Sequence, residues 1–349
     1  MDDITLGLLA WYDEHKRELP WRATRNPYHI WISEVILQQT RVAQGYDYFV
    51  RFIERFPTVE ALAGASDDEV MRMWQGLGYY SRARNLHAAA KQVVQGGAFP
   101  ERYEDIRALK GVGDYTAAAV ASFAFDVPVA AVDGNVCRVW SRMFGIDVPI
   151  DTALGKRQVA EVAQALLPTG QAAKYNQAAM EFGALQCVPK NPRCEDCPLA
   201  HKCMALAQGR VEELPIKKNR TKVVPRYLNY LYVHNAEALL LHKRTGDDIW
   251  LNLYELPLIE TPAPVDAEAL MDTGEWAAWH GSIPYYIYRG CVEGVKHVLS
   301  HRVLHAAFHE LEVQGELPCP EGYVAVPYAE LHRYALPRLI ERYLEKRCE

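Results

Sequence analysis

Four cysteines in the middle of the chain have the spacing of metal ligands. Cys187, Cys194, Cys197 and Cys203 form the pattern C-x6-C-x2-C-x5-C. Four thiolates on one short loop can hold a tetrahedral Zn²⁺ or an iron–sulfur cluster. Zinc sites usually combine two C-x2-C pairs, and this loop contains one, so we expect a [4Fe–4S] cluster. The other cysteines are scattered, and we interpret them as ordinary thiols: Cys137, Cys291, Cys319 and Cys348.

Two acidic residues are placed where their surroundings should give them different protonation states. Glu34 lies in the apolar run 30–37, where partial burial should raise its pKa and favour the neutral acid. Asp133 precedes a helical segment, whose N-terminal amides should keep its carboxylate ionised. Two carboxyl groups in distinct environments are the usual means of breaking a glycosidic bond. On pattern alone, Glu34 also fits a surface position on its helix, and Asp133 fits a plain N-cap.

The stretch LKGVGDY, residues 109–115, has the composition of a phosphate-binding turn. Gly111 and Gly113 permit positive φ and close backbone approach, so their amides can face a phosphate oxygen beside a helix N-terminus. This arrangement describes a helix–hairpin–helix motif. Asp114 places a negative charge near the expected phosphate, so the amides must provide that contact. Tyr115 can stack or form a hydrogen bond, but it cannot form an imine.

The elements that must position these residues are helical up to about residue 208. Asn26 and Pro27 form an N-cap and N1 pair for a helix expected to run through Thr40. Ser66, followed by DDEV, opens another helix with acidic residues in its first turn. Further helices are expected at 79–94, 151–167 and 172–186.

The rest of the chain has an α+β pattern. Strands are expected in RYLNYLYV (226–233), ALLLHKR (238–244) and HRVLHAAFHELEV (301–313), and a closing helix in ALPRLIERYLEKR (335–347). We therefore predict a multidomain chain with a helical domain at 1–208, a basic linker at 209–226 and an α+β domain at 227–349. From Leu214 to Arg226 the linker holds five basic residues and no acidic one, which suits either a solvated tether or a phosphate contact.

Charge and hydropathy limit the classes of partner. Residues 1–226 carry 28 basic and 26 acidic residues, net +2, whereas residues 227–349 carry 10 and 18, net −8. Contacts with nucleic acid must therefore come from local patches and backbone amides. No apolar run approaches the roughly 20 residues of a membrane span, and the N-terminal residues lack the features of a secretion or transit signal. We therefore expect a cytoplasmic protein of a reducing compartment.

The hairpin, the aspartate 20 residues beyond Gly113 and the four-cysteine loop resemble the endonuclease III superfamily of DNA glycosylases. Four segments look more closely like its MutY family of adenine glycosylases, and the resemblance covers nearly all of residues 1–208. The segments are LPWR (19–22), WISEVILQQTRV (31–42), GLGYYSRARNL (76–86) and VDGNV (132–136). The resemblance implies a helix–hairpin–helix fold with a [4Fe–4S] loop. It also implies a double-stranded DNA substrate in which adenine is mispaired with 8-oxoguanine or guanine. With it we expect a DNA-associated monomer of the bacterial cytoplasm.

The same resemblance implies roles for individual residues. Glu34 would protonate N7 of adenine and later assist the attacking water, Asp133 would stabilise the oxocarbenium-like sugar, and Asn135 would position Asp133. Tyr79 would wedge beside the partner base. Four residues would line or support the adenine pocket: Trp21, Arg22, Gln39 and Glu181. Trp21 and Tyr79 also fit ordinary core positions on pattern alone.

In the C-terminal part, DIWLNLYELPLIE (248–260) resembles a strand region of Nudix-like domains. The glutamate-rich R-E-x-x-E-E array of Nudix hydrolases does not follow it, so we expect a Nudix-like fold without hydrolase activity. The MutY family uses a Phe-Ser-His loop of this domain to recognise 8-oxoguanine. Here the loop reads Leu299-Ser300-His301, which retains Ser300 and His301 and replaces stacking by aliphatic packing. An ordinary turn between strands is the alternative.

Three other activities compete with adenine removal. A bifunctional relative of endonuclease III also cleaves the strand through a lysine amine, and the position of that lysine is held here by Tyr115, while Lys110 precedes the turn. A non-catalytic DNA-binding or redox-sensing iron–sulfur protein would tolerate the loss of Glu34. A Nudix pyrophosphatase is disfavoured by the missing glutamate array. We therefore expect a monofunctional glycosylase that stops at base removal.

Overall fold

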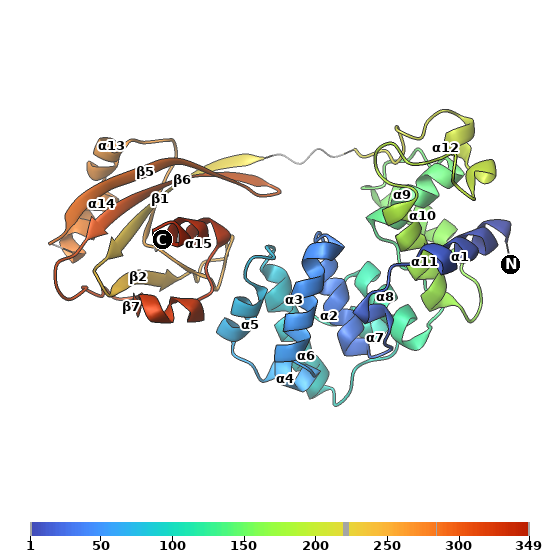
Figure 1. Ribbon diagram of the computed structural model, residues 1–349, viewed down its shortest axis with the longest axis horizontal. Helices are drawn as coiled ribbons and strands as arrows, with labels where there is room; N and C mark the ends of the chain where they lie inside the picture. Colours follow the sequence, from blue (N-terminus) through green and yellow to red (C-terminus); the bar gives the residue numbers. More distant parts are fainter. Residues whose placement is uncertain (1, 219–222, 284, 348–349) are drawn as a thin grey trace. The chain divides into compact units, whose positions relative to one another are not determined.

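The computed structural model describes residues 2–218, 223–283 and 285–347, coloured along the sequence in Figure 1. The chain divides into two compact units, one made of Met1–Gly64 and Asn85–Arg220 and the other of Ala65–Arg84 and Thr221–Glu349. Residues 65–84 therefore group with the C-terminal part. Across the described ranges, no helix is both long and apolar enough to cross a bilayer. Cys348 lies outside the described residues.

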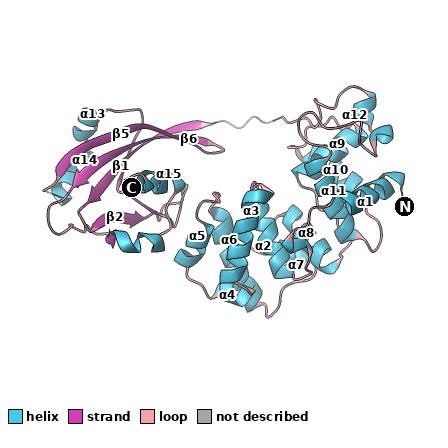
Figure 2. Cartoon of the chain, in the orientation of Figure 1, coloured by secondary structure: helices cyan, strands magenta, loops and turns pink. Residues whose placement is uncertain are grey.

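The first unit is helical, and its secondary structure is cyan in Figure 2. Its elements are α1 (Asp3–His15), η1 (Pro20–Arg22), α2 (Pro27–Leu37), α3 (Val42–Arg55), α4 (Val59–Ala63), α7 (Tyr103–Arg107), α8 (Asp114–Phe125), α9 (Gly134–Phe144), α10 (Ala153–Ala165), α11 (Ala172–Leu185), η2 (Ala200–Lys202) and α12 (Met204–Ala207). Helix α6 (Ser81–Gln95) contains the boundary between the units. The helical character predicted for this part of the chain is confirmed.

Local capping explains where several helices begin. The Asn26 side chain accepts hydrogen bonds from the amides of Tyr28 and His29, with Pro27 at the first helical position. This helix ends at Leu37, three residues before the predicted end, and Gln39 then adopts a left-handed φ of 59°. In the second unit, Ser66 and Glu69 form a capping box at the start of α5 (Asp67–Trp74).

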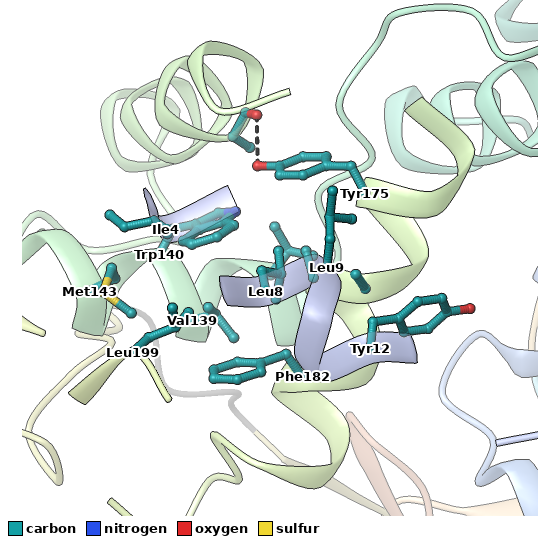
Figure 3. Close-up of a cluster of buried hydrophobic side chains, with 14 of the residues drawn as sticks. Ile4, Leu8, Leu9, Tyr12, Val139, Trp140, Met143, Tyr175, Phe182 and Leu199 are labelled. Carbon is teal, nitrogen blue, oxygen red and sulfur yellow. Dashed lines mark hydrogen bonds between the residues drawn. The ribbon is translucent and has the colours of Figure 1, made fainter. Parts of the chain in front are cut away.

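The core of the first unit forms where α1 and α9 pack against α11. Figure 3 shows Leu8 and Leu9 of α1 beside Phe182 of α11 and Trp140 of α9. Tyr175 packs in the same cluster, and its hydroxyl donates to the carbonyl of Ala163 at 2.9 Å. The buried apolar area holds α9 and α11 together, and both helices carry residues of the candidate site.

The second unit is built on a seven-stranded sheet, magenta in Figure 2. Its order is β3-β2-β1-β6-β5, with β4 also paired to β1 and β7 to β2. The strands are β1 (Val224–His234), β2 (Ala238–Lys243), β3 (Tyr254–Glu255), β4 (Leu258–Thr261), β5 (Ile287–Val298), β6 (Arg302–Glu312) and β7 (Tyr323–Pro327). The helices are α5, α13 (Ala267–Met271), α14 (Gly274–Ser282), η3 (Tyr328–Arg333) and α15 (Arg338–Glu345). The predicted α+β class is confirmed.

Strands β5 and β6 form a long hairpin whose turn lies between Val298 and Arg302. The Leu299 amide donates to the Arg302 carbonyl at 2.8 Å and closes the turn. Strand β6 also pairs in parallel with β1, where the Val224 amide donates to the His301 carbonyl at 3.0 Å. Strand β5 was not expected from the sequence, because Gly290 and Gly294 interrupt its alternation and its register shifts near both.

The segment expected to be a linker is packed on the first unit as far as Lys218. Leu214 is buried, and its carbonyl accepts from Nε of Arg142 at 3.0 Å. The Ile216 carbonyl accepts from the Ile150 amide at 3.0 Å, and the Lys218 amide donates to Asp151 at 2.9 Å. A freely solvated tether over 214–218 is therefore excluded. Residues 219–222 of the expected linker lie outside the described residues.

Candidate active site and metal centre

The candidate active site is a cavity of about 1130 Å³ in the first unit. Helix α8 packs on both α2 and α11, and α11 packs on α9, so these four helices form much of its wall, to which η1 and α10 also contribute. All eight residues expected at the catalytic centre and the adenine pocket line it: Trp21, Arg22, Glu34, Gln39, Tyr115, Asp133, Asn135 and Glu181. These residues come from positions as far apart as 21 and 181, so only folding brings them together.

Glu34 is a buried carboxyl group with a phenol as its partner. The side chain is 6% exposed, and the Tyr115 hydroxyl of α8 donates to Oε2 of Glu34. Burial raises the pKa of Glu34 to about 7; the Tyr115 hydrogen bond opposes the rise and the nearby charge of Asp133 adds to it. The direction agrees with the expectation from its apolar helix. Tyr115 stays protonated as a donor, because burial and the charge of Glu34 hold its pKa well above the ordinary value.

Asp133 is the N-cap of α9, and its carboxylate is held on two sides. Oδ1 accepts from the Val136 amide and Oδ2 from Nδ2 of Asn135, both at 2.7 Å. Burial raises the pKa of Asp133, while these two hydrogen bonds oppose the rise. The ionised state expected for Asp133 therefore depends on its hydrogen-bond donors.

Arg138 holds Asn135 in place from the other side. Its Nη2 donates to Oδ1 of Asn135 at 2.8 Å and to the Gly183 carbonyl at 2.6 Å, and its Nε donates to the Cys187 carbonyl at 2.8 Å. A Cβ on Gly183 would lie 2.7 Å from Cβ of Asn135, so glycine permits the close approach of α11 to α9. One arginine thus connects the Asp133 environment with the start of the cysteine loop.

Glu181 also borders the cavity, but its carboxylate is fully engaged by cations. Arg17 donates to it from Nε at 2.8 Å and from Nη2 at 2.6 Å, and Arg22 donates at 3.0 and 2.8 Å. Burial alone would raise the pKa of Glu181, but the hydrogen bonds from Arg17 and Arg22 lower it to about 2. The carboxylate holds Arg22 at the cavity. Trp21, the residue before Arg22, packs edge-on against Phe49, with 5.1 Å between the ring centroids.

The helix–hairpin–helix turn connects α7 to α8, as the sequence predicts. Gly111 has a φ of +74°, and a Cβ there would lie 2.5 Å from Cβ of Asn85, so this position requires glycine. Gly113 does not use its left-handed freedom, because its φ is −94° as the N-cap of α8. Around Gly113 the space next to the backbone is open. Arg107 donates to Oδ1 of Asp114, which compensates the negative charge that Asp114 brings to the turn.

The four cysteines of the loop lie around one small cavity next to α9. In the described part of the chain, no three His, Cys, Asp or Glu side chains are near enough to share a single metal ion. Nη1 of Arg142 donates to the Cys187 sulfur at 3.4 Å. Burial raises the pKa of Cys197 to about 11, so this thiol would stay neutral without a metal ligand bond. Four sulfurs around an enclosed space, with one cation beside them, fit a multi-iron cluster that binds them as thiolates.

The remaining site residues belong to the second unit, at a pocket of about 610 Å³. Tyr79 has a left-handed φ of 48°, and its hydroxyl forms a hydrogen bond with that of Ser300 in the β5–β6 turn. The Arg82 guanidinium lies 5.3 Å from the Tyr79 ring centroid. His301 lines the same pocket, as does Trp250, whose φ is 63°. Left-handed aromatic residues are costly and concentrate at functional sites.

The tertiary structure places at the first site three residues that were not expected there from the sequence. Arg17 pairs with Glu181 across 164 positions, Arg138 supports Asn135, and Gln38 donates to Thr116 at 2.9 Å. Arg138 follows Asn135 by three residues, which places the two side chains on one helix face and was a usable signal. The other two contacts depend on distant parts of the chain and carry no local signal.

Two family descriptions match the chain. Residues 32–167 match the HhH-GPD superfamily of base excision DNA repair proteins, and residues 229–346 match the NUDIX domain. The first match covers α2 through α10, including Glu34, Tyr115 and Asp133. The second covers most of the sheet in the second unit.

Individual relatives support the same comparison. The chain is 44% identical over 223 residues to an adenine DNA glycosylase of Rattus norvegicus, covering 60% of this chain and 43% of that protein. It is 35% identical over 254 residues to an adenine DNA glycosylase of Buchnera aphidicola, covering 72% of each. The chain therefore spans less than half of the rat protein and nearly three quarters of the bacterial one.

Among solved structures, a thermostable thymine-DNA glycosylase aligns with a TM-score of 0.55 and 30% identity, over 59% of this chain and 95% of that one. An endonuclease III in a non-covalent complex with DNA aligns with a TM-score of 0.51 and 25% identity, over 59% of this chain and 94% of that one.

Proposed function

Because the chain belongs to the adenine DNA glycosylase family, we propose that it removes adenine mispaired with 8-oxoguanine or guanine from double-stranded DNA. One observation supports this proposal above all: Glu34, which can hold a proton near neutral pH, and the hydrogen-bonded carboxylate of Asp133 line the same cavity. Glu34 has a pKa of about 7 and Asp133 caps α9 beside it. Two such groups supply the acid and the cation-stabilising anion that glycosidic cleavage requires.

The first step is protonation of the leaving base. The target adenosine must leave the helical stack to enter the cavity. Protonated Glu34 gives its proton to N7 of adenine, so that the base departs as a neutral molecule when the C1′–N9 bond breaks. Tyr115 holds the Glu34 carboxyl group in position through its hydrogen bond. The Asp133 carboxylate, fixed by Val136 and Asn135, stabilises the oxocarbenium-like sugar.

The second step adds water. Glu34 is now a carboxylate and accepts a proton from the attacking water, whose oxygen bonds to C1′. The proton given to adenine is thereby recovered, and the products are free adenine and an abasic site. Arg22 and Trp21 line the cavity beside these groups and are proposed to contact the extruded adenine together with Gln39, while Glu181 keeps Arg22 in place.

We further propose that the reaction stops at base removal. Strand cleavage would need an amine that attacks C1′ to form an imine. Tyr115 occupies the position of that amine and is committed to Glu34. The amide of Lys110 donates to Gln92 at 2.7 Å, which fixes the backbone ahead of the turn.

The partner base is proposed to be read in the second unit. Tyr79, Ser300 and His301 line one pocket there, and the Tyr79–Ser300 hydrogen bond fixes two of the three side chains. Leu299 supplies aliphatic packing in the turn instead of an aromatic ring. The amides of Gly111 and Gly113 are proposed to hold a DNA phosphate.

Cys187, Cys194, Cys197 and Cys203 are proposed to hold a [4Fe–4S] cluster. When bound, the cluster supplies iron–thiolate bonds that cross-link a loop with little regular secondary structure. Arg142 stabilises the loop independently through the carbonyls of Val188 and Pro189, at 2.8 and 3.0 Å.

The proposed function is tested by measuring base release from duplexes with adenine opposite 8-oxoguanine, guanine, cytosine or thymine. We expect release from the first two and much slower release from the others. Release from none of the four duplexes would overturn the assignment. Incubation of labelled dinucleoside polyphosphates with Mg²⁺ should give no hydrolysis, and hydrolysis would instead support a Nudix pyrophosphatase.

Borohydride trapping tests the monofunctional reaction. We expect no covalent protein–DNA adduct at catalytic rates and no strand cleavage that keeps pace with base release. An adduct that disappears in Lys110→Ala would show that the chain has a strand-cleaving activity.

A further inference from the structure

Five basic residues line the catalytic cavity, and three of them are committed to partners inside the protein. Arg17 and Arg22 are bound to Glu181, and Arg138 is bound to Asn135 and to two backbone carbonyls. These guanidinium groups position protein groups and are not free to hold a second anion. Arg41 and Lys156 are the remaining cations of the lining.

Lys156 lies on α10 and projects at the rim of this cavity. The residue is exposed, and no ion pair is formed by it within the described ranges. Its helix is capped by Thr152, whose hydroxyl accepts from the Gly155 amide at 3.2 Å. A Cβ on Gly155 would lie 2.2 Å from the Pro149 carbonyl oxygen, so glycine allows the 149–151 loop to close tightly against α10.

The same loop carries the basic segment that follows the cysteines. Ile150, itself part of the cavity lining, donates its amide to the Ile216 carbonyl, and Asp151 accepts from the Lys218 amide. Lys217 lies between these two anchored positions and is exposed, again without an ion pair inside the described residues. A segment that could have been a free tether is therefore held beside the catalytic cavity by its backbone.

Cys137 is a buried thiol whose pKa both lysines affect. This thiol lies in the cavity lining, one turn of α9 beyond Asp133. Burial and the charge of Asp133 raise the pKa of Cys137 to about 11, whereas the ammonium groups of Lys156 and Lys217 lower it. The backbone hydrogen bonds of Ile150 and Asp151 place Lys217 beside the loop that precedes α10, and the effect of both lysines on one thiol agrees with this placement.

We propose that Lys156 and Lys217 form a phosphate-binding clamp for the DNA backbone next to the extruded nucleotide. The inference rests on the proposed function, because Asp133 marks where the sugar of that nucleotide must lie. Its flanking phosphates are then the nearest anions that the substrate brings to this rim. Both ammonium groups extend from anchored backbone and form no ion pair within the described residues. A lysine binds a phosphodiester as a point charge and does not need the bidentate geometry of an arginine.

The clamp is tested by equilibrium binding to a duplex that contains 2′-fluoro-adenosine opposite 8-oxoguanine, which resists hydrolysis. Affinity is measured between about 50 and 200 mM KCl for the wild type, Lys156→Ala, Lys217→Ala and the double variant. The double variant should bind roughly tenfold more weakly, with a slope of log K against log salt that is shallower by about 1.8. Lys174→Ala is the matched control, because Lys174 is an exposed lysine of this unit already paired with Asp13 at 2.7 Å.

Methylphosphonate substitution locates the clamp on the DNA. Removing the charge of each phosphate flanking the target nucleotide, one at a time, should weaken wild-type binding at one or two positions. At those positions the double variant should show no further loss, since the lysines no longer have an anion to bind. Equal losses in the wild type and the double variant at every flanking phosphate, or an unchanged salt slope, would overturn the clamp.

The two proposals fail separately. If the wild type releases adenine and the double variant keeps the full salt slope, the glycosylase assignment stands and the clamp is wrong. If the wild type releases no adenine and the double variant shows the expected reduced slope, the glycosylase assignment is wrong and the phosphate site stands. Circular dichroism of each variant establishes that the fold is intact.

Discussion

Glu34 and Glu181 are two buried glutamates that border the same cavity, and the structure gives them opposite chemistry. Glu34 is 6% exposed and has a pKa of about 7, whereas Glu181 is 1% exposed and has a pKa of about 2. Burial acts in the same direction on both. The difference lies in their partners, because Glu34 meets a neutral phenol and Glu181 meets two guanidinium groups.

The comparison shows that one pocket can contain an acid and an anchor made from the same residue type. A carboxyl group without a cation can hold a proton near neutral pH and pass it to a base. A carboxylate bound by two arginines cannot, and it serves to fix those arginines. Five predictions follow from the contrast, in order of decreasing effect.

The first prediction is a Glu→Gln substitution at the acid, which the second prediction repeats at the anchor. Glu34→Gln should lower single-turnover release of adenine opposite 8-oxoguanine by roughly 10³-fold, the range of a lost general acid and base. Duplex binding should be retained, and thermal stability should not fall. Glu54→Gln, on the exposed surface of α3, serves as the control and should be unchanged. A Glu34→Gln variant with nearly wild-type rates would indicate a non-catalytic DNA-binding protein.

The second prediction concerns the anchor. Glu181→Gln should destabilise the first unit by about 4 kcal/mol, because two guanidinium groups lose their shared buried anion. Denaturant unfolding measures this loss, and any decrease in activity should follow the fraction of folded protein. A stable Glu181→Gln variant that has lost activity would show instead that Glu181 takes part in catalysis directly.

The third prediction uses the opposite signs of the two pKa shifts. The folded-state pKa of Glu34 is raised from 4.5 to about 7, so its stabilising contribution is complete below about 4.5 and is lost as the pH rises through about 7. Between those limits, Glu34→Gln should gain about 3 kcal/mol of stability relative to wild type.

Glu181 provides the internal control for that measurement. Its pKa is lowered to about 2, so its contribution is complete above 4.5 and is lost as the pH falls toward 2. The stability deficit of Glu181→Gln should therefore shrink in acid. Parallel pH profiles for the two variants would contradict the assignment of opposite shifts.

The fourth prediction is the pH dependence of the chemistry. Because the first step needs protonated Glu34, single-turnover base release should fall as the pH rises above about 7, approaching tenfold for each further pH unit. Saturating enzyme separates this effect from DNA binding. A rate that stays constant from pH 6 to pH 9 would exclude Glu34 as the acid.

The fifth and smallest effect is expected at Tyr115. The Tyr115 hydrogen bond lowers the pKa of Glu34, so Tyr115→Phe should move the falling limb of the pH–rate profile to higher pH. Base release near neutral pH should fall only severalfold, since Glu34 stays in the cavity with a less precise orientation. A merely structural role for Tyr115 would change stability and leave the profile where it was.

Much of this architecture could be predicted because it depends on residues close together in the sequence. The Asn26 cap and the Ser66 capping box each involve four residues, and their helices begin where expected. Asp133 caps α9 through an amide three positions away. Gly111 is required by its own φ, although the side chain that also excludes a Cβ, Asn85, could not be foreseen.

The sequence by itself determined the helical and α+β parts, the cysteine spacing, the N-cap aspartate and the tyrosine after the hairpin. The apolar surroundings of Glu34 in the sequence also indicated the acid. Only the tertiary structure decided that Glu34 meets a phenol and that Glu181 is an anchor bound by two arginines. The partner of Glu34 lies 81 positions away and that of Glu181 lies 164 positions away. Protonation follows from burial and from the charges within a few ångströms, and both are created when distant helices pack. The anchoring of Lys217 beside the cavity has the same origin.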